Sequence, residues 1–192
     1  MTTPKSPLPK SLKGRPFRYH EAISAGLTRH QLHILILEGI LEQRTRGIYA
    51  ETQVELDDDQ AFTSAMLRVG NPSAICLLSA LSYYGLTDEI PNKTWIMVPF
   101  EKRSRYPDLK LFRTRNPHWD IGIEQQSGFR ITSLDRTLVD SLANKSKLGS
   151  VIGIQALKTG LNQRKTKIRN IAELARQLGV FHRIKTIVEA IG

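Results

Sequence analysis

The sequence predicts an α+β fold: an N-terminal winged helix-turn-helix, then a mixed domain with a small β-sheet and C-terminal helices. Three observations lead to this prediction. A capped helix and a two-strand pattern follow one another within residues 17–50, short strand patterns recur over 95–132, and apolar residues recur at helical spacing from residue 133 onward. We therefore expect a flexible basic arm (1–16), a winged helix-turn-helix domain (17–70) and an α+β domain (71–192).

The composition indicates a soluble, basic protein. Its 192 residues carry 28 Lys and Arg against 18 Asp and Glu, and the net charge is +10. Residues 51–100 are acidic and the rest of the chain is basic, so a polyanion such as nucleic acid is the natural partner, with a solvated basic surface as the alternative. No apolar run is long enough to cross a membrane, no signal peptide is evident, and the single cysteine excludes an intrachain disulfide. We expect a cytoplasmic location and no membrane partner.

Residues 1–16 are rich in proline and lysine and offer little apolar surface to bury. We interpret them as a flexible basic arm that ends near Arg15. Such an arm either stays free in solution or lies along a DNA backbone or minor groove.

The next stretch predicts two short helices joined by a tight turn. The first covers about residues 17–25. Thr28 is a good N-cap, and Gln31 three residues later completes a capping box for a helix over 29–38, which Gly39 ends. Two short helices arranged in this way make a helix-turn-helix.

Two strands at 40–44 and 47–50 follow directly and predict a hairpin, the wing. In a winged helix the second helix presents its first turn to base edges, and the wing lies on the backbone. Arg can bind guanine and Gln adenine through two hydrogen bonds, each worth ~1–3 kcal/mol of discrimination. The same fold also serves as a protein–protein module, but the basic charge favours DNA. The predicted DNA-binding residues are Thr28, Arg29, His30, Gln31 and His33 on the helix, Arg44 and Arg46 on the wing, and Arg15 and Arg18 before them.

No metal or cofactor is predicted. His30 and His33 lie one helical turn apart, and Asp57–Asp59 opens a helix expected over 56–69. Neither group has the three or four ligands of a protein metal site. We interpret the histidines as a polar or DNA-facing surface and the aspartates as a helix start that complements the helix dipole. Cys76 is expected to be a core residue rather than a nucleophile.

One catalytic alternative is a metal-dependent nuclease or nuclease remnant. Asp108 before one strand and Glu124 on another are carboxylates of the type that holds a catalytic metal ion. The lysine that should follow closely after the glutamate is missing, since Gln125 and Gln126 stand there. We therefore expect no enzyme.

The second half of the chain alternates between strand and helix patterns. A helix should open at Asn71-Pro72 and end at Gly85, and Ser133 should cap a helix that runs to Leu142. Strands are expected at 95–98, 110–113, 120–124 and 129–132, and further helices at 149–160, 168–178 and 182–191. Two basic segments between these elements are candidate contacts for phosphate or an acidic partner, or else solvated surface: Lys102, Arg103 and Arg105 in one, and Arg164, Lys165 and Lys167 in the other.

Four segments together resemble the AbiE-type antitoxins of bacterial abortive-infection systems, which act in phage defence. They are Arg46–Tyr49 in the wing, Leu78–Leu86, the run from Ile90-Pro91 to Pro99, and Ile131–Asp140 with its Arg-Thr-Leu-hydrophobic-Asp pattern. The resemblance covers about residues 17–160.

The resemblance implies a two-part regulator without an active site. In that family a winged helix binds inverted repeats in double-stranded promoter DNA and represses its own toxin–antitoxin operon, and a C-terminal domain counteracts a co-encoded nucleotidyltransferase-type toxin. A dimer or a cooperative pair on the DNA would suit inverted repeats. Arg136 and Asp140 either pair with each other, four residues apart on one helix, or face the toxin. A plain transcriptional regulator is the remaining alternative.

Overall fold

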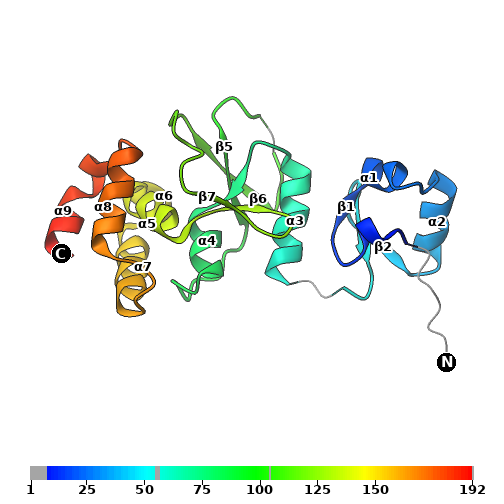
Figure 1. Cartoon of the computed structure of the whole chain (residues 1–192), viewed down its shortest axis with the longest axis horizontal. Helices are drawn as coiled ribbons and strands as arrows, with labels where there is room; N and C mark the ends of the chain where they lie inside the picture. The colour runs from blue at the N-terminus through cyan, green and yellow to red at the C-terminus, as the bar shows by residue number, and fades with distance from the viewer. Residues whose placement is uncertain (1–7, 55–56, 104, 192) are drawn as a thin grey trace. The chain divides into compact units, whose positions relative to one another are not determined.

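The computed structural model describes residues 8–54, 57–103 and 105–191. The chain forms two compact units, Met1–Gly70 and Asn71–Gly192 (Figure 1). Unit 1 has a small antiparallel sheet and unit 2 has a mixed sheet, each accompanied by helices, so the fold is α+β. Within the described residues, no helix combines the length and apolar character needed to cross a membrane.

Unit 1 is built around a three-stranded antiparallel sheet. Phe17–Arg18 forms β1, Leu41–Thr45 forms β2 and Ile48–Glu51 forms β3, and the order across the sheet is β1-β3-β2. Between β1 and β2 the chain makes two helices. The helical elements of the unit are η1 (Lys10–Leu12), α1 (Tyr19–Ser24), α2 (Arg29–Leu37) and α3 (Asp58–Val69).

The expected boundaries of α2 are confirmed to within a residue. Thr28 Oγ1 accepts the Gln31 N–H at 3.1 Å, and Gln31 Oε1 accepts the Thr28 N–H at 2.8 Å, which is the predicted capping box. Leu32 and Leu35 are buried and hold this helix in the core of the unit. Gly39 follows with a φ of 71°, a left-handed conformation that glycine adopts without steric cost.

The predicted flexible arm is wrong for residues 8–16, whereas residues 1–7 lie outside the described part of the chain. Leu8 and Leu12 are buried in the core of unit 1 at 3% and 1% exposure, four residues apart on the turn around η1. The Gly14 N–H donates to Glu51 Oε2 at 2.7 Å, and the Gln60 side-chain amide donates to the Gly14 carbonyl at 2.9 Å. The segment is therefore a folded part of the unit, because two leucines bury enough surface to hold its prolines in place.

Unit 2 contains a five-stranded mixed sheet in the order β6-β5-β4-β8-β7. The pairs β4–β5 and β7–β8 are antiparallel, and the pairs β5–β6 and β4–β8 are parallel. The strands are β4 (Ala74–Ile75), β5 (Thr94–Pro99), β6 (Leu109–Thr114), β7 (Ile123–Gln125) and β8 (Arg130–Thr132).

The helix expected to open at Asn71-Pro72 starts later than predicted. Ala74 and Ile75 instead form the central strand β4, and α4 (Leu77–Tyr83) begins only after Cys76. Both β4 residues are fully buried and pair with β5, and Ile75 also pairs with β8. A two-residue strand buried on both faces has the same apolar composition as a buried helix, so local patterning does not separate the two.

Helix α5 (Leu134–Ala143) lies at the centre of the helical part of unit 2, and Ser133 caps it as predicted. It packs against α4, α7, α8 and α9. Gly153 of α7 lets that helix approach α5 closely, because a Cβ there would lie 3.1 Å from the Ser141 carbonyl oxygen. The other helices are α6 (Lys145–Leu148), α7 (Ser150–Asn162), α8 (Ile168–Gln177) and α9 (Phe181–Ile191), drawn from yellow to red in Figure 1.

Candidate nucleic-acid interface

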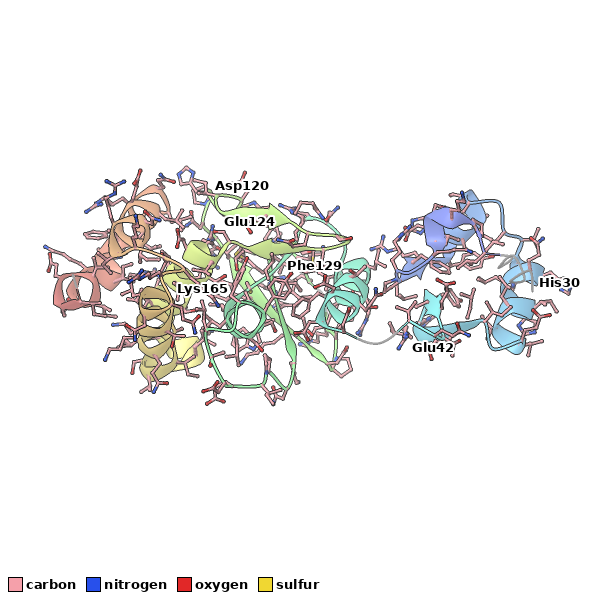
Figure 2. All side chains as sticks on the ribbon, turned by 60° about the horizontal axis from the view of Figure 1, so that its bottom comes forward. His30, Glu42, Asp120, Glu124, Phe129 and Lys165 are labelled. Atoms are coloured by element: carbon pink, nitrogen blue, oxygen red, sulfur yellow. The ribbon has the colours of Figure 1, made fainter. Side chains whose placement is uncertain are left out.

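The outer face of α2 carries the exposed polar residues of unit 1 that suit base reading. Arg29, His30 and His33 are all exposed, and His30 points away from the helix into solvent (Figure 2). Leu37 follows four residues after His33 and is 69% exposed. The sequence pattern does not single out Leu37, because a leucine at the end of an apolar stripe is ordinarily counted in the core.

Gln31 does not fit its predicted role in base reading. Its Oε1 accepts the Thr28 N–H, and Thr28 Oγ1 accepts the Gln31 N–H in return. A two-bond contact with adenine needs both the oxygen and the nitrogen of the glutamine amide. Gln31 would have to give up the capping box to make that contact, so Thr28 and Gln31 hold the end of α2 in place.

The two arginines of the predicted wing have different environments. Arg44 forms an ion pair with Glu42 at 2.6 Å and donates to the Val54 carbonyl at 2.8 Å, and its side chain is only 14% exposed. The guanidinium ties β2 to the segment after β3, and this role competes with the predicted phosphate contact. Arg46 is exposed in the β2–β3 turn and remains a candidate contact.

Arg15 and Arg18 also act within unit 1 rather than as free cations. Arg15 pairs with Glu21 at 3.0 Å and donates to the Ser11 and Pro16 carbonyls. The Arg18 guanidinium donates hydrogen bonds to the Leu67 carbonyl near the end of α3. These contacts connect β1 and α1 with η1 and α3, which corrects the prediction that both arginines bind DNA.

The two basic segments of unit 2 are partly used inside the fold. Lys165 donates from Nζ to the Tyr84 carbonyl at 2.7 Å and so fastens the α7–α8 turn to the end of α4 (Figure 2). Lys102 donates to the Asn71 carbonyl at 3.3 Å, and Arg103 lies 5.1 Å from the centre of the Phe100 ring. The remaining predicted contacts, Arg105, Arg164 and Lys167, are exposed on the surface.

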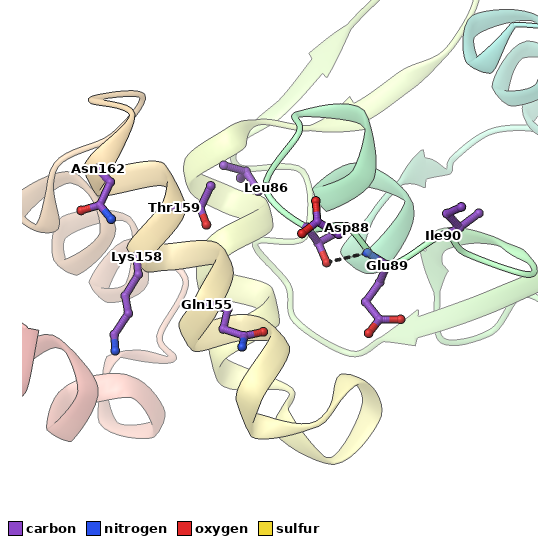
Figure 3. A pocket seen from close by; sticks show the side chains of 9 residues that line it. Leu86, Asp88, Glu89, Ile90, Gln155, Lys158, Thr159 and Asn162 are labelled. Atoms are coloured by element: carbon purple, nitrogen blue, oxygen red, sulfur yellow. Dashed lines mark hydrogen bonds between the residues drawn. The ribbon is translucent and has the colours of Figure 1, made fainter.

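A cleft between the Leu86–Ile90 loop and α7 carries charges of both signs. Asp88 and Glu89 line it from the loop and Lys158 from the helix, and the Glu89 N–H donates to Thr87 Oγ1 (Figure 3). Because two carboxylates and one lysine line this cleft, its charge does not favour the binding of an anion.

The residues of the nuclease alternative are not brought together. Asp108 immediately precedes β6, whereas Glu124 lies on β7, and these strands are the opposite edges of the five-stranded sheet. Four strand spacings of about 4.8 Å separate the two edges by roughly 19 Å, too far for both carboxylates to hold one metal ion. Among the described residues, no group of three His, Cys, Asp or Glu side chains is placed to bind a metal.

Fold and surface together define an α+β protein of two units, and the first unit exposes Arg29, His30 and His33 on one face of α2. No family model and no curated protein matches the chain. Among solved structures, it resembles the Rv2827c protein from Mycobacterium tuberculosis with a TM-score of 0.55 and 16% identity. The match covers 84% of this chain and 66% of that protein, so the chain spans slightly less than two thirds of its length. At this identity the likeness concerns the fold alone.

Proposed function

We propose that this protein is a DNA-binding antitoxin that represses its own operon and counteracts a co-encoded nucleotidyltransferase-type toxin. The observation that carries the DNA-binding part is the outer face of α2, where Arg29, His30 and His33 are exposed while Leu32 and Leu35 anchor the opposite face. A positioned helix with free cationic and imidazole groups can enter a major groove.

The topology of unit 1 supports this proposal. In chain order the elements are β1, α1, α2, β2 and β3, and the sheet order is β1-β3-β2. In a winged helix the second helix of the helix-turn-helix enters the major groove and the hairpin lies on the backbone. We assign α2 the first role and the β2–β3 hairpin the second.

The contacts found in unit 1 refine the roles of the residues. Arg29 and His33 are the best placed for base edges, and Leu37 at the end of the same face suits a thymine methyl group. Arg46 in the hairpin turn suits a phosphate. Gln31 acts through the position of α2 and makes no base contact of its own.

The test is fluorescence anisotropy with duplex DNA from upstream of the protein's own gene and with a scrambled duplex, at two salt concentrations. Arg29→Ala should reduce the preference for the upstream duplex by about tenfold, as the loss of a two-bond base contact of ~1–3 kcal/mol predicts. Arg46→Ala should weaken binding to both duplexes and lower the salt slope by about 1. Arg169→Ala, which removes an exposed arginine on α8 of unit 2, is the charge-matched control.

Equal effects of Arg29→Ala and Arg169→Ala would show that net charge alone drives binding, and the assignment of α2 would then be wrong. Binding that does not distinguish the two duplexes would also overturn it. The number of protein copies per duplex, measured by light scattering, tests the expected dimer or cooperative pair.

The antitoxin part of the proposal comes from the resemblance of Leu78–Leu86 and Ile131–Asp140 to AbiE-type antitoxins. Within those segments, Arg136 and Asp140 are buried and paired, so a toxin contact must come from other residues of unit 2. Co-expression with a nucleotidyltransferase encoded next to this gene should relieve growth arrest. Arrest that persists despite a comparable level of folded antitoxin would contradict this part and leave the DNA-binding part standing.

A further inference from the structure

A second pocket of unit 2 differs from the cleft at α7 in the sign of its charge. It has a volume of about 570 Å³ and lies where β6 and the segment after it meet α5, α6 and the α8–α9 junction. Arg113 and Arg115 line its β6 side, where Arg113 Nε donates to the Lys102 carbonyl at 3.0 Å. Lys147 of α6 and Arg183 of α9 line the opposite side. Among the described residues that line it, Asp140 alone is acidic, and Arg136 neutralises it at 2.8 Å.

The wall that carries Arg115 is held in place before any ligand arrives. Asn116 donates from its side-chain amide to the Leu178 carbonyl at 2.9 Å, and its Oδ1 accepts the His118 N–H at 2.9 Å. The Arg115 guanidinium lies 3.6 Å from the centre of the Phe100 ring, which limits its freedom. A preformed wall reduces the entropy lost when a ligand binds.

Two of the four cations have no partner to neutralise them. In the described part of the chain, neither Lys147 nor Arg183 makes an ion pair or side-chain hydrogen bond, and both are exposed. Cations that converge from separate elements on one concave site repel one another, and a bound anion would relieve that repulsion.

We propose that this pocket binds a small phosphorylated molecule that carries at least two negative charges. The pocket volume lies within the range of roughly 300 to 1,000 Å³ that small-molecule sites occupy. Arginine and lysine are the side chains that commonly bind phosphate groups in proteins. A concave site of this size suits a compact ligand better than the broad surface of a DNA duplex. All residues that line the site belong to unit 2, whereas the DNA-binding face proposed for α2 belongs to unit 1.

The test is isothermal titration of the full chain with inorganic pyrophosphate in 150 mM KCl. Binding should saturate at one pyrophosphate per chain. Lys147→Ala and Arg183→Ala should each weaken it by at least about tenfold, as expected for the loss of one hydrogen bond to a charged group. The matched controls are Lys145→Ala, which removes the other lysine of α6, and Arg169→Ala on α8, because neither residue lines the pocket. Each control should change affinity by less than about twofold.

Three outcomes would overturn the proposal. The first is the absence of saturable pyrophosphate binding by the folded wild-type chain, and the second is equal weakening by the pocket variants and the controls. The third is that duplex DNA displaces pyrophosphate and that Lys147→Ala and Arg183→Ala weaken duplex binding as strongly as pyrophosphate binding, because the pocket would then belong to a nucleic-acid surface. Circular dichroism of all four variants verifies that they are folded, as expected for exposed side chains.

Discussion

Arg136 and Asp140 form a buried ion pair one helical turn apart on α5, with 2.8 Å between Nε and Oδ2 and side-chain exposures of 2% and 10%. The same guanidinium donates to the carbonyls of Trp119 and Ile121, which precede β7. Burial raises the pKa of Asp140 above its ordinary value, and the Arg136 guanidinium partly opposes that rise. The pair therefore connects the central helix to the segment that leads into the edge strand β7.

Loss of this pair should be costly. Asp140→Ala leaves a guanidinium buried without its carboxylate, and we expect the free energy of unfolding to fall by about 3 kcal/mol or more. Glu189→Ala is the control, since it removes another i,i+4 pair of unit 2, Lys185–Glu189, whose partners are 3.7 Å apart and about 60% exposed. The control should cost less than about 1 kcal/mol. Urea unfolding of both variants measures the difference, and equal costs would mean that the buried pair does not stabilise the fold.

A second prediction concerns the N-terminal segment. Leu12 is 1% exposed in the core of unit 1, so Leu12→Ala should lower the free energy of unfolding by about 2–5 kcal/mol. Lys13→Ala, one residue later and exposed, should change it by less than about 0.5 kcal/mol. Urea unfolding, followed by circular dichroism, distinguishes the two. If Leu12→Ala proved as mild as Lys13→Ala, the segment would be the loose arm that its prolines suggest.

Elements that carry their own start signal are the ones that the sequence predicts well. The Thr28–Gln31 capping box and the Ser133 cap lie within three residues of the backbone groups they satisfy, so local reading finds α2 and α5. The short strand β4 has no such signal, because its pairing partners Met97 and Ile131 are distant in the chain.

The candidate DNA interface is predictable only in part, because some of its residues make contacts with residues that are distant in the chain. Helical periodicity predicts that Arg29 and His33 are exposed, and the structure confirms it. The engagement of Arg44 with the Val54 carbonyl and of Arg18 with the Leu67 carbonyl depends on tertiary packing, which charge and spacing do not encode. The pocket cations Lys147 and Arg183 come from separate helices and meet only in the folded chain.

Tyr84 leads to a prediction about alkaline stability. Its hydroxyl donates to the Thr132 carbonyl at 3.0 Å and faces Glu124 Oε2 at 3.5 Å, so the end of α4 is joined to the β7–β8 edge of the sheet. Burial raises the pKa of Tyr84 well above the ordinary tyrosine value, and the negative charge of Glu124 raises it further.

The sign of the effect on stability follows from the raised pKa. Below about pH 10 the hydroxyl is protonated in both the folded and the unfolded chain, and its contribution to stability is fully present. Above that pH the unfolded chain releases the proton first, so stability should fall, by up to about 1.4 kcal/mol per pH unit for this one proton. Tyr84→Phe should therefore lose less stability between pH 9.5 and 11 than the wild type, as measured by urea unfolding at each pH. Glu124→Gln leaves the hydroxyl buried, so the pKa of Tyr84 stays raised and the slope over this range should match that of the wild type. If all three proteins had the same slope, Tyr84 would not be the group that governs the alkaline loss.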